Sequence, residues 1–305
     1  MDLRQMRYVV AVAETGNFTR AAEQCFVVQS ALSHQIKALE RELGVELFAR
    51  TSRKVEPTAA GLAFVDGARR TLAQADRTVA DAAAAVGRIR GRLTLGIIPT
   101  VTGIDLPDAL RRFRDAHPAV TVSLQVGGSD EIVADIRAGA VDVGLLGLPA
   151  GDVPEGVRSR VIARDRHVAC VAVDHPLAGR RSIGLDRLAG ETFVDFPADT
   201  PGRAQSDRAF DAAGLDRTVA YEVMALDIVA GLVRAGLSVA LLPSAVAPSD
   251  DPGVSLVPVR GGPARAEHLA WSDFNPSPAA TAFLSIVDAS SPAGDSPAVI
   301  GRPAD

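Results

Sequence analysis

Apolar positions recur with helical spacing in the first third of the chain and with strand-like runs after it. Side chains that return every three or four residues predict helices over residues 3–15 and 29–43. A short helix that begins near Asn17 is predicted between them, with Phe18, Ala21, Ala22 and Cys25 as its buried face. The stripe of the third helix consists of Leu32, Ile36, Leu39 and Leu43. Gly44 follows it, where a left-handed residue ends a helix without strain. We expect the helix over 3–15 to complete a three-helix core.

The face of residues 29–43 opposite this stripe is polar. Its hydrogen-bonding side chains are Gln29, Ser30, Ser33, His34 and Lys37. Two helices joined by a short turn, with a polar outer face on the second, form the helix-turn-helix pattern, which places the second helix in the DNA major groove. An ordinary helical hairpin with a solvated polar face has the same pattern, so these residues alone leave both interpretations open.

Residues 45–58 predict a short hairpin with a basic tip, which carries Arg50, Arg53 and Lys54. A basic hairpin beside a recognition helix can hold phosphates or enter the minor groove. This feature favours DNA binding over a plain helical hairpin.

Residues 1–61 resemble the LysR-type transcriptional regulators, which are bacterial winged helix-turn-helix proteins. The matching segments are Leu3 to Tyr8, Asn17 to Ala22, Gln29 to Ser33, Gln35 to Ile36, Leu39 to Glu40, Leu43 to Val45, Leu47 to Arg50 and Thr58 to Gly61. The chain departs from the family pattern at Val28, where a serine usually caps the recognition helix, and at Pro57 and Ala59, where the next helix begins. None of these changes removes a residue expected to contact DNA.

Residues 58 to about 90 are rich in alanine and predict one long helix with a narrow apolar seam. The seam consists of Ala59, Leu62, Ala63, Val65, Leu72, Ala75 and Val79. Such a helix would span about 45 Å and is rarely stable alone, so we expect it to pair with a second copy. The resemblance implies the same, since this segment is the family's dimerisation helix. A linker helix lying on its own domain is the alternative.

From residue 91 onwards, strands alternate with helices through short turns, which predicts an α/β fold with a parallel sheet covered by helices. The expected strands are 92–98, 120–126, 141–146, 167–173, 192–196, 219–223, 238–242 and 269–271. The expected helices are 105–117, 130–138, 205–213, 226–235 and 278–287.

The resemblance implies that this part is a two-subdomain, periplasmic-binding-protein-like effector domain. The domains are then a winged helix-turn-helix domain at 1–58, the linker and dimerisation helix at 59–90, and the effector domain at 91–288. Subdomain I covers 91–161 and 266–288, and subdomain II covers 162–265. The remaining residues, 289–305, contain too little apolar material to pack, and we predict a disordered tail.

A ligand of an open α/β sheet lies beyond the carboxyl ends of the strands, near helix N-termini. By resemblance, Thr100 and Ser129 stand where family members contact their effector. The full candidate set is Thr100, Thr102, Ser129, Phe196, Arg203, Met224 and Leu226. Its hydroxyls and arginine favour a small organic anion, with Phe196, Met224 and Leu226 as an apolar wall. Each hydroxyl could instead cap a helix.

The charged residues are distributed unevenly along the chain. The chain has 305 residues and a net charge of −5, which alone argues against nucleic acid. Residues 1–90, however, hold 13 Lys and Arg against 10 Asp and Glu, a net +3, and the remainder holds 19 against 27, a net −8. A basic head on an acidic body fits DNA binding through a local patch.

Known catalytic patterns are missing from the sequence: there is no Gly-x-Ser-x-Gly, no phosphate-binding glycine loop with lysine and no His-Glu-x-x-His. We therefore expect no enzyme activity, no metal and no cofactor. Cys25 and Cys170 lie in apolar stretches, where thiols are usually inert, and a peroxide sensor would need a second thiol within reach. A solute-binding protein would fit the body but not the head.

The expected location and partners follow from these features. The N-terminus has no apolar signal core and no segment reaches eighteen apolar residues, so we expect a cytoplasmic protein without a membrane partner. The expected partners are double-stranded DNA with a palindromic operator, a small-molecule effector that gates activity, and further copies of the chain in a homodimer or homotetramer.

Overall fold

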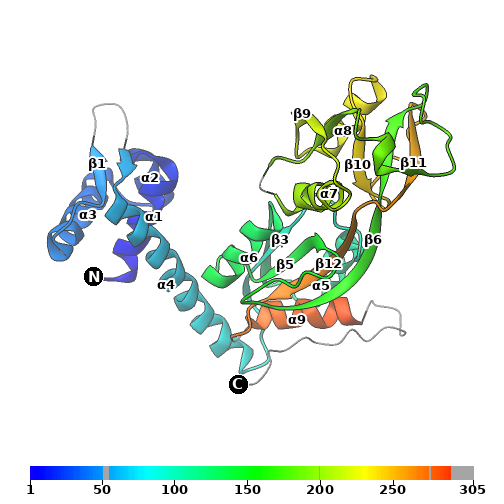
Figure 1. Cartoon of the computed structure of the whole chain (residues 1–305). Coiled ribbons are helices and arrows are strands. Elements are labelled where there is room, and N and C mark those ends of the chain that lie inside the picture. Colours follow the sequence, from blue (N-terminus) through cyan, green and yellow to red (C-terminus); the bar gives the residue numbers. More distant parts are fainter. Residues whose placement is uncertain (51–54, 199, 275, 290–305) are drawn as a thin grey trace, which may run out of the picture. The chain divides into compact units, whose positions relative to one another are not determined.

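The structure is a computed structural model with two compact units (Figure 1). We call the unit Met1–Arg88 the head and the unit that begins at Ile89 the body, and we describe each by itself. The described residues are 1–50, 55–198, 200–274 and 276–289.

The head is a three-helix core with a two-stranded wing. Its elements are α1 (Leu3–Thr15), α2 (Phe18–Gln24), α3 (Gln29–Leu43), β1 (Phe48–Arg50), β2 (Val55–Pro57) and α4 (Ala59–Ala84). Local caps set these bounds: Asp2 and Gln5 form a capping box at α1, and the Asn17 side chain caps α2. Gly16 and Gly44 end α1 and α3 in the left-handed conformation.

The stripe predicted on α3 faces the core of the head. Leu32, Ile36 and Leu39 are fully buried there, whereas Leu43 is 38% exposed at the end of the helix. Glu40 ties the wing to α3, because its carboxylate accepts hydrogen bonds from the backbone N–H groups of Leu47 and Phe48 at 2.9 and 3.3 Å. The wing therefore has a fixed attachment to the helix beside it.

Helix α4 begins after the Thr58 cap, as expected, but ends at Ala84, earlier than the expected end near residue 90. The chain then turns through Gly87, whose φ is 75°. The predicted seam is divided between two environments: Val65 packs into the head core, while Leu62 and Val79 are 61% and 56% exposed. Only part of the seam is thus free to meet another copy.

The body is an α/β fold. Its strands are β3 (Gly91–Ile97), β4 (Val120–Val126), β5 (Val143–Pro149), β6 (Arg158–Ala172), β7 (Ile183–Gly184), β8 (Thr192–Asp195), β9 (Thr218–Glu222), β10 (Ala240–Pro243), β11 (Val254–Arg260) and β12 (Ala264–Trp271). Its helices are α5 (Leu106–Ala116), α6 (Ser129–Ala138), the short 3₁₀ turn η1 (Leu185–Arg187), α7 (Pro201–Ala212), α8 (Leu226–Arg234) and α9 (Pro278–Asp288).

The main sheet is mixed and not purely parallel. Its order is β4-β3-β5-β12-β6-β11-β7, with β10 also paired to β6, and β8 and β9 form a second small sheet. Strand β3 runs parallel to β4 and β5, as the alternation predicts, but β12 runs antiparallel to β5 and β6. Strand β12 follows the excursion through the second subdomain, so local alternation could not reveal its direction. Strands β7 and β11 also escaped prediction.

Strand β6 belongs to both subdomains and runs the length of the body (Figure 1). Its residues 158–166 pair with β12, and its residues 167–172 pair with β10 and β11. The chain thus passes from subdomain I to subdomain II between Arg166 and His167 and returns at Ala264. The sequence placed these passages at 161/162 and 265/266.

Each subdomain of the body has its own apolar core. In subdomain I the rings of Phe113 and Phe283 meet edge to face at 5.7 Å, and in subdomain II Phe193 and Phe210 do so at 5.6 Å. Apart from Ala289, the predicted tail lies outside the described residues. Among the described residues, no helix has the length and apolar character needed to cross a membrane.

Candidate DNA-binding face and ligand cavity

The polar face predicted on α3 lies on the surface of the head. Gln29, Ser30, His34 and Lys37 are exposed and Ser33 is half-buried, while Leu32, Ile36 and Leu39 of the same helix are fully buried. Residues four apart, such as Gln29 and Ser33, share one face of a helix. The five side chains therefore form one continuous face at the N-terminal half of α3.

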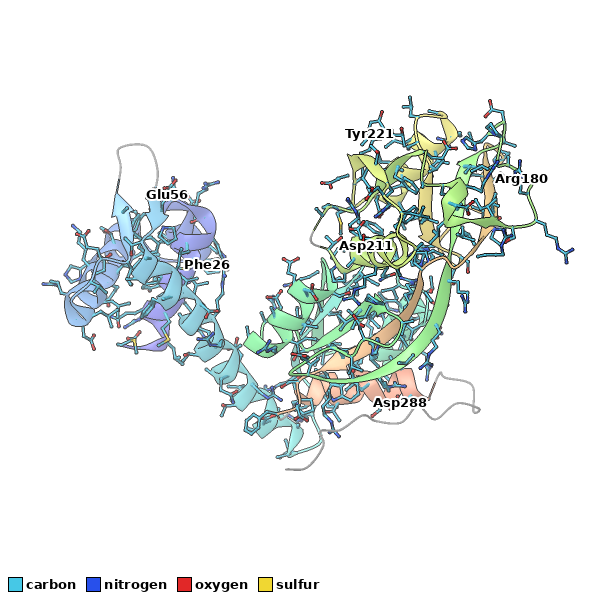
Figure 2. The ribbon with its side chains drawn as sticks, in the orientation of Figure 1. Phe26, Glu56, Arg180, Asp211, Tyr221 and Asp288 are labelled. Carbon is cyan, nitrogen blue, oxygen red and sulfur yellow. The ribbon has the colours of Figure 1, made fainter. Side chains whose placement is uncertain are left out.

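The N-terminus of α3 has no side-chain cap, because the N-cap residue is Val28. The preceding turn contains Phe26, which has a φ of 56° and is 96% exposed; Figure 2 shows it at the surface of the head. Free N–H groups and the positive end of the helix dipole attract anions such as phosphate. The lost cap therefore leaves backbone donors beside Gln29.

The described residues include only part of the wing. Strand β1 pairs antiparallel with β2, and Arg50 is opposite Val55, next to the tip of the hairpin. The predicted phosphate-contacting residues Arg53 and Lys54 fall on the tip, residues 51–54, which is outside the described residues, as is the side chain of Arg50.

A cavity lies between the two subdomains of the body. It has a volume of about 30 Å³, counted as the space open to the centres of water molecules. Its lining residues are Ile98, Pro99, Thr100, Gly127, Gly128, Ser129, Gly147 and Arg265 from subdomain I, and His167, Phe196, Thr200, Pro201, Gly202, Gln205, Met224 and Pro243 from subdomain II. A ligand in this cavity would contact both subdomains at once.

Four of the seven predicted effector residues line this cavity. Thr100 and Ser129 do so from subdomain I, and Phe196 and Met224 from subdomain II. The Ser129 hydroxyl already bonds to the backbone of Gly147, since it donates to the Gly147 oxygen at 3.1 Å and accepts from the Gly147 N–H at 3.0 Å. Its proton is therefore used to hold β5 and not offered to a ligand.

The other three candidates have different partners. Thr102 donates its hydroxyl to Glu267 at 2.5 Å. Arg203 bonds to Asp207 and Glu222, both at 3.1 Å, and to the Phe196 oxygen. Leu226 packs in the apolar cluster beneath α8. None of the three is among the residues that line the cavity.

The cation at the cavity is Arg265, which sequence reasoning missed. It is 2% exposed, and its Nη1 donates to the Thr100 hydroxyl at 2.6 Å while its Nη2 donates to the Thr100 oxygen at 2.9 Å. Nη2 also meets the Glu267 carboxylate at 2.7 Å. The available signal was an Arg-x-Glu pair in β12, whose other residues are apolar apart from His268. Charged side chains in a buried strand must be paired, so such a pair predicts a buried ionic contact.

Burial controls the charges around the cavity. It lowers the pKa of His167 to about 4, with a further contribution from the nearby positive charge of Arg265. His167 is therefore neutral at pH 7. The Arg265 pKa is also lowered from its ordinary value, because loss of solvent outweighs the attraction of Glu267 and Asp165.

Two contacts join the subdomains beside the cavity. Gln205 on α7 donates from Nε2 to the Gly147 oxygen on β5 at 3.2 Å, and Arg208 on α7 pairs with Asp152 at 2.6 Å. Both contacts would break if α7 moved away from β5. These two contacts thus help to fix the arrangement of the two subdomains in this structure.

The thiols and metal-ligating groups form no centre of their own. Cys170 is buried in β6, and burial raises its pKa to about 12; burial also raises the pKa of Cys25 in the head. In the described part of the chain, no three His, Cys, Asp or Glu side chains gather in a way that could hold a metal ion.

A winged helix-turn-helix head together with a two-subdomain body around a cavity defines a DNA-binding protein that responds to a ligand. Comparison with protein families agrees: the family "Bacterial regulatory helix-turn-helix protein, lysR family" matches residues 3–62, and "LysR substrate binding domain" matches residues 87–291. The chain belongs to the LysR family. It is a DNA-binding transcriptional regulator with an effector-binding domain, and the family consists of regulators and not of enzymes.

Relatives cover most of the chain. It is 36% identical over 255 residues to the Escherichia coli (strain K12) protein named uncharacterized HTH-type transcriptional regulator YnfL, covering 80% of this chain and 82% of that one. It is 31% identical over 280 residues to the DNA-binding transcriptional dual regulator OxyR of the same strain, covering 90% and 91%. The solved structure of CbnR, a LysR family regulator, matches with a TM-score of 0.69, 29% identity and 95% and 99% coverage. CbnR has also been solved with its target DNA.

Proposed function

We propose that the protein binds a palindromic operator through the exposed polar face of α3. The observation that carries this proposal is the exposure of polar side chains along the N-terminal half of α3, whose apolar residues Leu32, Ile36 and Leu39 are fully buried. These polar residues are Gln29, Ser30, Ser33, His34 and Lys37. Residues 29–37 contain no acidic side chain, so this face does not repel phosphate. Glutamine can pair with adenine through two hydrogen bonds, while serine and lysine can contact base edges or the backbone.

The wing and the helix N-terminus would add the sequence-independent part of the affinity. Arg50, Arg53 and Lys54 belong to the hairpin that Glu40 attaches to α3, and positive charge there would neutralise phosphates. The uncapped N–H groups at the start of α3 support a further phosphate contact.

A palindromic operator requires two recognition helices related by a two-fold axis. The exposed apolar side chains Leu62 and Val79 on α4 support pairing of this helix with its copy, in a homodimer or in a homotetramer built from dimers. As a regulator acting on chromosomal DNA, the protein would work in the cytoplasm.

The body would gate this activity through a small effector, which we take to be an organic anion, bound in the cavity between the subdomains. A ligand shifts a conformational equilibrium only if it binds the two states differently. Two observations support such a difference: both subdomains line the cavity, and the Gln205 and Arg208 contacts join the subdomains beside it.

The test of DNA reading is Gln29→Ala, with Gln74→Ala on the exposed side of α4 as the matched control. Operator binding and binding to random DNA are measured by fluorescence anisotropy. Gln29→Ala should cost about 1–3 kcal/mol on the operator and little on random DNA, because only base contacts are lost. Equal losses on both DNAs would refute sequence reading by this face. Gln74→Ala should leave both affinities unchanged.

A further inference from the structure

The N-cap residue of α3 is Val28, which is 68% exposed. Its backbone is held in place, because its oxygen accepts hydrogen bonds from the N–H groups of Ala31 and Leu32 at 3.1 and 3.2 Å. Val28 directly precedes Gln29, the first residue of the polar face. The start of α3 therefore presents an apolar side chain to solvent beside hydrogen-bonding ones.

Val28 is a poor choice for the stability of the head. An N-cap position favours Ser, Thr, Asp or Asn, whose side-chain oxygen accepts from backbone N–H groups. The other three helices of the head have such caps, which are Asp2, Asn17 and Thr58, whereas Val28 provides none for α3. The apolar residue that anchors the turn is instead Val27, which packs against the head core. Folding of the head therefore does not account for an exposed valine at this position.

The turn that precedes Val28 has a fixed shape. The Phe26 N–H donates to the Glu23 oxygen at 3.1 Å, and the Val27 N–H donates to the Ala22 oxygen at 2.9 Å. The φ of Phe26 is 56°, a conformation that is rare for a bulky residue. Valine itself has one side-chain torsion, which its branched Cβ restricts. A contact made by Val28 would therefore cost little conformational entropy.

The position of Val28 selects the group that it can meet on DNA. The helix-turn-helix geometry places the N-terminal residues of the second helix at base edges in the major groove. The C5-methyl group of thymine is the apolar group exposed there, and the other groups are hydrogen-bond donors or acceptors. A valine side chain has neither donor nor acceptor, so the methyl group is the one that it can contact favourably. A phosphate contact would instead need a donor or a positive charge.

We propose that Val28 reads a thymine of the operator by packing against its C5-methyl group in the major groove. This inference rests on the proposed function, since it adds a base-specific contact at the same end of α3. Gln29 then reads a base through hydrogen bonds, and Val28 reads a nearby thymine through an apolar contact.

The experiment requires DNA in which single thymines can be changed. The full-length wild-type protein selects a duplex from a library of random DNA, and fluorescence anisotropy measures its affinity. Each thymine is then replaced by deoxyuridine, which forms the same base pair but lacks the methyl group. At the thymine that Val28 contacts, the wild-type protein should bind roughly fourfold more weakly, the effect expected for one buried methyl group, and about fifteenfold more weakly when both half-sites are changed.

Val28→Ala assigns this effect to the valine side chain. The variant loses the apolar contact but leaves the N–H groups of α3 without a side-chain cap, as in the wild type. It should bind the thymine and deoxyuridine duplexes equally well at that position. Val45→Ala is the matched control, because Val45 is 46% exposed and lies beyond the other end of α3. It should keep the wild-type difference between the two duplexes.

The contrary outcomes separate this proposal from the proposed function. The thymine contact is refuted if deoxyuridine weakens wild type and Val28→Ala equally at every thymine, or if Val45→Ala also loses the difference. Sequence reading by α3 would still hold in that case, provided that Gln29→Ala loses affinity for the selected duplex and not for random DNA. If selection enriches no sequence, the protein reads no bases and both proposals fail.

Discussion

Cys170 provides the sharpest test of how this regulator receives its signal, because relatives of the chain include proteins named hydrogen peroxide-inducible genes activators. A thiol must be ionised to attack peroxide, and the sulfenic acid that forms needs a second thiol to close a disulfide. Cys170 is 1% exposed in β6, and the only other cysteine, Cys25, belongs to the head. We predict that peroxide does not regulate this protein through its thiols.

The magnitude follows from the pKa. Burial raises the pKa of Cys170 from 9.0 to about 12, so at pH 7 only about one thiol in 10⁵ is ionised, roughly a thousandfold fewer than for an ordinary cysteine. A more basic thiolate is intrinsically more nucleophilic, which recovers roughly thirtyfold. Strands β10 and β11 pair with β6 on either side of Cys170, so peroxide can reach the thiol only when these strands separate, which lowers the rate of oxidation further.

The assay treats Cys25→Ser protein with hydrogen peroxide and measures Cys170 oxidation by mass spectrometry and operator affinity by anisotropy. Both should be unchanged from the untreated protein. The same treatment in urea, where burial is lost, should oxidise Cys170 and shows that oxidation is detectable. A peroxide-dependent change in operator binding that disappears when Cys170→Ala is added would refute the reasoning.

Two further predictions concern the head. Arg53→Ala should weaken binding to all DNA sequences. It should also make the dependence of affinity on salt concentration less steep, because a protein that has lost one phosphate contact releases fewer counterions on binding. An unchanged slope would show that Arg53 does not contact the DNA. Val79→Asp should convert the dimer to monomer in sedimentation, since it buries an unpaired charge between paired α4 helices. Gln74→Asp, about 140° around the helix from Val79, should stay dimeric, and a dimeric Val79→Asp protein would move the seam elsewhere.

The sequence by itself determined the local elements of the head. The bounds of α1 follow from its capping box and from Gly16, and the end of α3 follows from Gly44. The course of both helices follows from apolar residues three or four apart along the chain. The exposure of Ser30 and His34 follows as well, because burial of Leu32 and Ile36 turns these two side chains outward. Short-range spacing is sufficient wherever a helix fixes the direction of each side chain.

Only the tertiary structure decided the composition of the ligand cavity. Thr100 was predicted from its place after a strand, but its partner Arg265 is 165 residues away in sequence. Arg203 looked equally suitable for an anion, yet Asp207 and Glu222 already engage it. Which arginine lies at the cavity depends on the antiparallel return of β12 beside β5 and β6, a long-range pairing that no local pattern of apolar and polar residues encodes.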